Sequence, residues 1–175
     1  EQYFEGIYDL RKCRRSAREL DINRLQDINT LHYIPNEVIE ALKASNIPFR
    51  LAHLSTAMLN YAEAFDADVV CIIKRNKLHI LARNEEQFCF YNSFYCVDIN
   101  DFLYFSLMVL QQFGLDQSHS RIHFAGDIDR SAKLYIQLRY HIPALRVIDD
   151  VFKTHKPTIQ PRQVYFELFL SRTCV

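Results

Sequence analysis

Five aspartates are the side chains of this sequence best placed for metal-dependent chemistry, because each stands at the end of a predicted strand or helix. They are Asp66, Asp68, Asp98, Asp127 and Asp129. A two-metal nuclease needs several carboxylates that converge on one point, one of them in the middle of the first strand of its sheet. Cys71 occupies that strand, and Asp98, Asp127 and Asp129 are explained more simply as caps. We therefore expect no nuclease activity.

The cysteines and histidines suggest a second chemistry, a thiol hydrolase built from Cys71 or Cys89 with His79 or His123. Such a nucleophile needs a lowered thiol pKa, which a helix N-terminus or a nearby cation supplies. Both cysteines stand in apolar predicted strands without a helix N-terminus beside them. Both histidines alternate onto sheet faces, where packed or half-exposed side chains are usual. We therefore expect no hydrolase site.

All cysteines are expected to be free thiols in a reducing compartment, which favours a cytoplasmic location. They are Cys13, Cys71, Cys89, Cys96 and Cys174, an odd number with no C-x-x-C pair. Zinc is not expected, because cysteine and histidine do not cluster at the spacing of metal ligands.

The overall composition argues against further classes of partner. Hydrophobic residues make up 49% of the 175-residue chain, which is enough for a packed core. Lysine plus arginine and aspartate plus glutamate each number 21, so the formal net charge is zero. Nucleic acid is therefore not an expected partner. No apolar run approaches the roughly 20 residues that span a bilayer, and the basic run at residues 11–15 is interpreted as a solvated helix face.

Glycine is scarce, which argues against the common phosphate-binding loops. Only Gly6, Gly114 and Gly126 occur, and neither G-x-x-x-x-G-K-[ST] nor G-x-G-x-x-G can be assembled from them. Such loops need glycine because backbone N–H groups must approach the phosphate closely and turn at positive φ.

The elements that would position these side chains are predicted from hydrophobic periodicity and end signals. Residues 68–97 are the clearest part, with three strands joined by two short polar turns. The predicted strands cover residues 30–34, 48–53, 69–73, 78–83, 88–94, 121–125 and 145–148. The predicted helices cover residues 36–45, 55–65, 99–113, 130–141 and 161–173.

Particular residues mark the ends of these elements. The predicted N-caps are Asn36, Ser55, Asp129 and, for the helix over 99–113, either Asp98 or Asn100. Gly114 is predicted to end that helix in a left-handed conformation. Asn76 is predicted to supply the left-handed residue of the turn over 74–77.

The sequence resembles an uncharacterised bacterial family with an actin-like ATPase fold, similar in style to the platform domains of pilus assembly and type II secretion. The segments that carry the resemblance are residues 31–59, 90–94, 101–105, 122–127 and 134–138. The resemblance implies an α/β, ribonuclease H-like or actin-like fold over residues 29–175. Its mixed five-stranded sheet, an antiparallel meander plus parallel strands, would be flanked by helices. Residues 1–28 are interpreted as the remnant of a first subdomain, the first actin-like half being missing or greatly shortened.

The actin-like class implies a nucleotide between two halves, held partly by an Asp-x-Gly motif in the first meander strand. The matching positions are Cys71, Ile72 and Ile73, so the carboxylate and the glycine are both missing. We therefore expect no ATPase activity. The adenosine-binding motif of the class corresponds to Ala125, Gly126 and Asp127. These three residues are the candidate cofactor-binding residues, and the simpler interpretation is a strand-to-helix turn that needs one glycine.

The leading hypothesis is a non-catalytic, degenerate actin-like domain that serves as a binding or scaffold module for a protein partner, without a bound cofactor. The alternative is a nucleotide-binding, ATPase-like protein that binds ATP through a phosphate site lying mainly in an absent first half. A third hypothesis is a peptide-binding platform protein. No catalytic residue and no metal ligand is predicted.

Overall fold

The computed structural model describes residues 19–23, 28–32, 34–48, 51–83 and 88–148 of the chain. Contacts divide the chain into two compact units, Glu1–Thr56 and Ala57–Val175. The basic run at 11–15 and the predicted helix over 161–173 lie outside the described residues. The predicted domain boundary between residues 28 and 29 stays a prediction. Within the described part of the chain, no helix is long and apolar enough to cross a membrane.

The first unit contains a two-stranded antiparallel hairpin and one helix. β1 (Glu19–Asn23), which the sequence pattern does not predict, pairs with β2 (Ile28–His32). α2 (Asn36–Ala44) follows, and the predicted cap Asn36 is its first residue rather than its N-cap. Pro35 holds the N-cap position, where its ring offers no hydrogen-bond acceptor and its carbonyl accepts the N–H groups of Val38 and Ile39.

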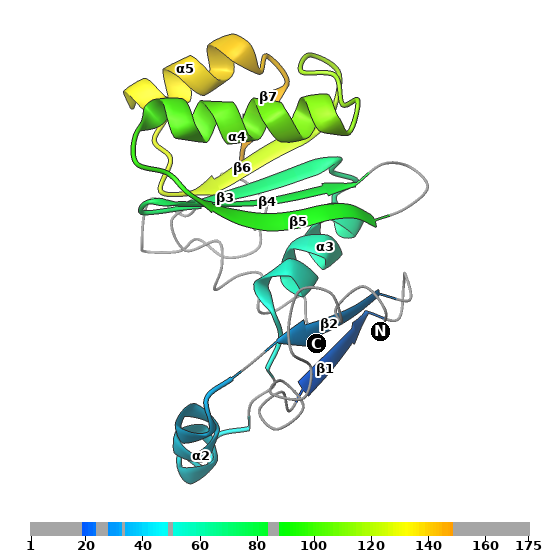
Figure 1. The fold of residues 1–175 in the computed structure, drawn as a ribbon, viewed down its shortest axis with the longest axis vertical. Coiled ribbons are helices and arrows are strands. Elements are labelled where there is room, and N and C mark those ends of the chain that lie inside the picture. Colours follow the sequence, from blue (N-terminus) through cyan, green and yellow to red (C-terminus); the bar gives the residue numbers. More distant parts are fainter. Residues whose placement is uncertain (1–18, 24–27, 33, 49–50, 84–87, 149–175) are drawn as a thin grey trace, which may run out of the picture. The chain divides into compact units, whose positions relative to one another are not determined.

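The second unit is built on a five-stranded mixed sheet in the order β5-β4-β3-β6-β7 (Figure 1). β3 pairs antiparallel with β4, and β4 with β5, whereas β3 pairs parallel with β6 and β6 with β7. The strands are β3 (Val69–Lys74), β4 (Lys77–Arg83), β5 (Phe88–Tyr95), β6 (Ile122–Gly126) and β7 (Leu145–Val147). The predicted sheet, a meander followed by parallel strands, is confirmed.

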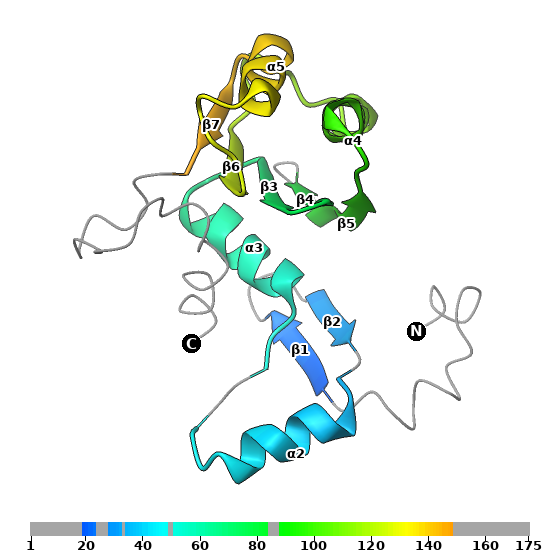
Figure 2. The same cartoon turned by 90° about the vertical axis from the view of Figure 1, so that its left-hand side faces the viewer.

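Helices cover both faces of this sheet. α4 (Ile99–Gln112) and α5 (Lys133–His141) lie on one face, and the part of α3 (Leu54–Ala64) from Ala57 onward lies on the other (Figures 1 and 2). Side chains of β3 alternate between the two faces. Cys71 and Ile73 belong to the core under α4 and α5, whereas Val70 and Ile72 point to the α3 face and are fully buried. The central strand is therefore apolar throughout because it is covered on both sides.

Aromatic side chains pack α4 against the edge strand β5. The rings of Phe94 and Phe105 stack with centroids 4.3 Å apart, and the rings of Phe90 and Phe113 are 5.5 Å apart. Each such pair adds about 0.5–1.5 kcal/mol to the stabilisation that comes from apolar burial.

The predicted ends of α4 are confirmed. Asp98 is the N-cap, and its carboxylate accepts hydrogen bonds from two N–H groups of the first turn, at 2.7 and 3.2 Å. Gly114 has φ +63°, and the N–H of Leu115 donates to the carbonyl of Leu110 at 2.9 Å. This bond closes the helix in a Schellman motif, for which a left-handed glycine is the preferred residue.

Two predictions before α3 are wrong. Residues 51–53 form no strand, and Ser55 lies inside α3 instead of capping it. His53 does the capping, because its Nδ1 accepts a hydrogen bond from the Ser55 N–H at 3.2 Å and lies 2.7 Å from the Ser55 hydroxyl. This local bonding turns the chain into the helix in place of an extended strand.

The predicted start of α5 is also wrong. Asp129 does not cap this helix, which begins at Lys133. Its carboxylate instead accepts hydrogen bonds from the Ser131 N–H at 2.7 Å and hydroxyl at 2.6 Å. The Asp129 carbonyl accepts the N–H of Ala132 at 3.0 Å. These short-range bonds stabilise a separate turn that competes with the first turn of a helix.

Candidate functional site

The candidate site lies at the carboxyl edge of the parallel strands, where β3 and β6 end side by side. Ile73 pairs with Gly126 at the end of the shared ladder. A two-residue turn, Arg75 and Asn76, then joins β3 to β4, and Asp127 follows β6 directly. Ligands of open α/β sheets bind at this edge, so this is where the implied nucleotide contacts belong.

The turn after β3 is tied to the end of β6 by a carboxylate. The backbone N–H of Arg75 donates to Asp127 Oδ2 at 2.8 Å. Arg75 has φ +52°, whereas Asn76, the predicted left-handed residue, does not have a positive φ. That prediction is wrong, and the Asp127 bond gives the reason, because it holds the Arg75 N–H in place against the ordinary preference of a side-chain-bearing residue.

Gly126 is required by the close approach of two backbones. Its φ is +91°, and a Cβ added to it would lie 1.9 Å from the carbonyl oxygen of Ile73. The N–H of Asp127 donates to that same oxygen at 2.7 Å. The spacing of β3 and β6 therefore accounts for this glycine without a ligand.

The three candidate cofactor-binding residues have different surroundings. Ala125 is fully buried and Gly126 is buried, whereas Asp127 is exposed. Asp127 is thus the one member of this set with a side chain at the surface, and that side chain accepts the Arg75 N–H. Nucleotide binding by these residues stays a prediction.

The five candidate aspartates do not converge. Asp98 caps α4, Asp127 binds the turn after β3, and Asp129 binds Ser131. The hydrogen bonds from Ser131 hold the pKa of Asp129 below its usual range. Asp66 and Asp68 precede the first residue of β3, at the opposite edge of the sheet. In the ranges that the structure describes, no group of three or more His, Cys, Asp or Glu side chains is placed to bind a metal ion.

Asp66 and Asp68 form an ion-pair cluster with two arginines. Arg121 donates to Asp68 through Nη2 at 2.6 Å, Nε at 3.2 Å and its backbone N–H at 2.7 Å. Its Nη1 contacts Asp66, which also binds Arg83 Nη2 at 3.1 Å. Asp66 adopts φ +49° just after α3, the conformation that ends a helix. The cluster joins the amino ends of β3 and β6.

This cluster sets the ionisation of Asp68. Burial raises the pKa of its carboxyl, but the hydrogen bonds and the charge of Arg121 outweigh burial and lower the pKa below its usual range. No sequence motif considered above predicts this cluster. A usable signal exists, because Asp68 and Arg121 each stand just before a strand, and the amino ends of parallel neighbours meet at one edge.

The structure separates Cys71 from both histidines. Cys71 faces α4, where burial raises the pKa of its thiol. His79 and His123 lie on the opposite face of the sheet from Cys71. The Nδ1 atom of His79 is 3.2 Å from the Tyr91 hydroxyl, and that of His123 is 3.1 Å from the Tyr61 hydroxyl. The described residues thus contain no pairing of Cys71 with these histidines. The side chain of Cys89 lies outside the described part of the structure.

Comparison with known proteins identifies a sequence family and a fold. A family described as "Protein of unknown function (DUF3822)" matches residues 15–145. A solved structure from Bacteroides thetaiotaomicron, described as a protein with actin-like ATPase fold and unknown function, is similar with a TM-score of 0.71. The two sequences are 16% identical, and the match covers 90% of this chain and 58% of that chain. The chain thus has an actin-like ATPase fold and spans little more than half of that neighbour. No curated protein matches the sequence.

Proposed function

We propose, given that the chain belongs to the DUF3822 family of proteins of unknown function, that it is a non-catalytic, degenerate actin-like domain. In this proposal the domain binds or organises a protein partner. The observation that carries the proposal is the hydrogen bond of 2.8 Å between the Arg75 N–H and Asp127 Oδ2.

In this proposal, the Asp127 carboxylate lies beside the turn that follows the positions corresponding to the phosphate motif of the actin-like class. A turn that binds phosphate needs open backbone N–H groups and a positive local potential. Here the N–H of Arg75 already donates a hydrogen bond to Asp127, and the negative charge of this carboxylate repels phosphate. Positive charge around the turn comes from Lys74, Arg75 and Lys77. However, the Arg75 N–H that would contact a phosphate directly already donates to Asp127.

The strand before the turn offers no catalytic group either. Cys71, Ile72 and Ile73 are at most 1% exposed. Hydrolysis of ATP needs a metal ion and a positioned water, and buried thiol and aliphatic side chains hold neither. These two observations together support loss of the inherited chemistry.

A protein is the partner class that we propose. The zero formal net charge gives no basis for attraction to nucleic acid. With the nucleotide chemistry lost, an actin-like sheet retains a rigid surface, and rigid scaffolds commonly position binding residues.

Calorimetry with magnesium and ATP tests the proposal on the whole chain. We expect no binding heat at nucleotide concentrations up to about 1 mM, and no release of inorganic phosphate in a coupled assay. Micromolar binding that is weakened in Arg75→Gln, or measurable hydrolysis, would refute the proposal. The variant Asp127→Ala removes the blocking carboxylate, and Asp129→Ala is the matched control because it removes a nearby carboxylate that does not contact the turn. Weak ATP binding gained by Asp127→Ala alone would support the blocking role directly.

A second candidate function is a nucleotide-binding, ATPase-like protein whose phosphate site lies mainly in a first half outside this chain. The observation that favours it is the longer neighbour, of which this chain covers 58%. It predicts that the whole natural protein gains thermal stability from ATP in a magnesium-dependent way, by about 2.7 kcal/mol at a hundred times the Kd. Unchanged unfolding temperature across millimolar nucleotide would exclude it.

A further inference from the structure

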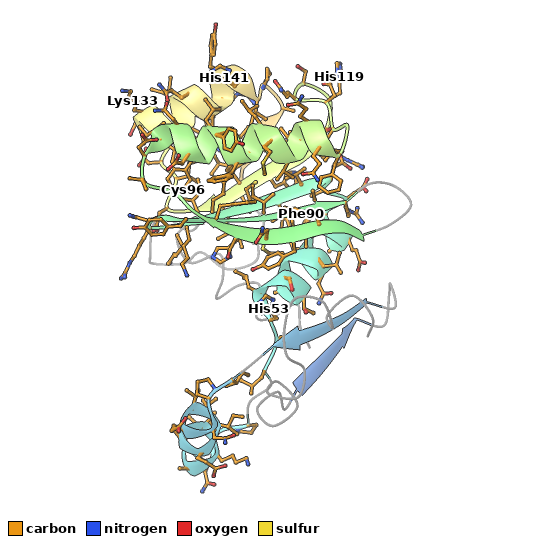
Figure 3. All side chains as sticks on the ribbon, in the orientation of Figure 1. His53, Phe90, Cys96, His119, Lys133 and His141 are labelled. Carbon is orange, nitrogen blue, oxygen red and sulfur yellow. The ribbon has the colours of Figure 1, made fainter. Side chains whose placement is uncertain are left out.

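A cavity of about 320 Å³ opens at the amino edge of the sheet, at the opposite end of β6 from Asp127. Its wall is built by the loop between α4 and β6 and by the segment that leads from α5 into β7. His119, labelled in Figure 3, lies on the first of these loops. This volume is at the lower end of the range for small-molecule sites.

One hydrogen bond joins the two walls of this cavity, and contacts of Arg139 stabilise the second wall. The N–H of Ala144 donates to the carbonyl of Gln117 at 3.0 Å. Arg139 Nη1 donates to the carbonyl of Leu145 at 2.7 Å and also contacts the carbonyl of Pro143. The cavity is therefore fixed by backbone groups before any ligand arrives, which lowers the entropy cost of binding.

The lining of the cavity is strongly basic. It includes Arg121, Arg139 and Arg146, and none of the described residues that line it is an aspartate or glutamate. Asp66 and Asp68 compensate the charge of Arg121. Among the residues that the structure describes, no carboxylate forms an ion pair with Arg139 or Arg146. Among the described residues, Arg139 and Arg146 thus have no ion-pair partner, and a carboxylate beside the cavity, that of Asp116, already accepts hydrogen bonds from the N–H groups of Ser118 and His119.

The donors in the lining match the oxygens of a phosphate group. A guanidinium carries five N–H donors in a fixed fork, and the contacts of Arg139 with the carbonyls of Pro143 and Leu145 use Nη1 alone. Ser118 and Ser120 add hydroxyl groups to the same wall. Arginine forks and hydroxyl donors are a common combination for phosphate recognition.

We propose that this cavity binds a small phosphorylated molecule, whose phosphate oxygens accept hydrogen bonds from Arg139 and Arg146. The site is independent of the proposed function, because it lies at the other edge of the sheet from the Arg75–Asp127 turn. Its basic charge is local, since the chain as a whole is neutral.

Calorimetric titration of the whole chain with inorganic pyrophosphate, in a buffer free of phosphate and sulfate and at constant ionic strength, tests the proposal. We expect one site, and a loss of affinity of about tenfold in Arg146→Gln, the effect of one charge-assisted hydrogen bond. The matched control Arg75→Gln makes the same charge change at the carboxyl edge, and we expect its affinity to stay within about twofold of wild type. Circular dichroism checks that both variants fold. If Arg146→Gln does not fold, Arg139→Lys replaces it in the titration, because lysine keeps the charge but lacks the guanidinium fork.

Three results would overturn the proposal. The first is no binding heat for the wild type up to about 10 mM pyrophosphate. The second is an equal loss of affinity in Arg75→Gln and Arg146→Gln, which would indicate unspecific attraction. The third is succinate binding as tightly as pyrophosphate, which would indicate a carboxylate site. ATP binding that depends on Arg75 but not on Arg146 would instead refute the proposed function and leave this site unaffected.

Discussion

Replacing Gly126 with alanine is the sharpest test of how the sheet is joined at the candidate site. The added Cβ would lie 1.9 Å from the carbonyl oxygen of Ile73, and side-chain carbons essentially never approach an atom closer than 3.0 Å. The two backbones must therefore separate by about 1.1 Å, the difference between these distances. This movement weakens the bond from the Asp127 N–H to Ile73 and displaces the carboxylate that binds Arg75.

The expected cost follows from these contacts. A residue with a side chain in the left-handed region costs about 1–2 kcal/mol relative to glycine. Each of the two weakened hydrogen bonds contributes about 1 kcal/mol. The free energy of unfolding should thus fall by about 3–4 kcal/mol. With a urea m-value near 2 kcal/mol/M, the midpoint of unfolding falls by about 2 M.

Gly114→Ala provides the matched control for this measurement. Gly114 also has a positive φ, +63°, but nothing lies within 4 Å of its added Cβ. Urea unfolding should therefore show a loss of only about 1–2 kcal/mol for Gly114→Ala. If Gly126→Ala costs no more than Gly114→Ala, the close approach of β3 and β6 is not what requires this glycine, and our reasoning fails.

Three further predictions concern buried or paired side chains. Tyr61→Phe removes the hydroxyl that lies 3.1 Å from His123 Nδ1, and it should lower the free energy of unfolding by about 1 kcal/mol; a loss below the error of chemical denaturation would contradict the contact. Asp68→Asn should cost about 1 kcal/mol at pH 7, because it breaks a partly exposed pair in which the Arg121 side chain is 42% and the Asp68 side chain 17% exposed. Since the folded-state pKa of Asp68 is lowered, its stabilisation is present above the ordinary aspartate pKa of about 3.9 and is lost as the pH falls through the folded value. The stabilities of the wild type and Asp68→Asn should therefore begin to converge below about pH 4, and a constant difference down to pH 2 would refute the ion pair. Cys71, whose thiol pKa is raised by burial, should resist iodoacetamide in the native protein and react in urea, as read by peptide mapping; rapid native labelling would show that the strand opens.

Sequence patterns predict the sheet well because burial on one or both faces leaves a readable period. The apolar run from Val69 to Ile73 becomes the doubly covered central strand, and Gly114 ends α4 as its missing side chain allows. Both signals depend on local chemistry and on burial alone.

Prediction fails where a competing side-chain contact decides the backbone. The ring of His53, not the hydroxyl of Ser55, accepts the N–H at the start of α3, and histidine is not among the usual capping residues. Asp129 bonds to Ser131 and delays α5. The position of the helix start thus depends on which of several nearby acceptors binds a given backbone N–H. A sequence pattern does not contain this information.

The candidate site is only partly readable from the sequence for the same reason. The residues Cys71, Ile72 and Ile73 visibly contain neither an aspartate nor a glycine, and the structure places all three in the core. The partnership of Asp127 with Arg75 joins residues 52 positions apart. Only the parallel pairing of β3 with β6 brings them together, so no local pattern predicts it.

The position of β3 between β4 and β6 also bears on the order in which the chain folds. β3 meets β4 across a turn of two residues, whereas its pairing with β6 joins Val69 to Ile122. Closing the short loop costs far less chain entropy, so the meander can form before the parallel pair. Contacts that form after the rate-limiting step mainly control how fast the native protein unfolds. We expect Gly126→Ala to accelerate unfolding much more than it slows refolding in a chevron analysis. The close contact between β3 and β6 would then determine the kinetic stability of this domain.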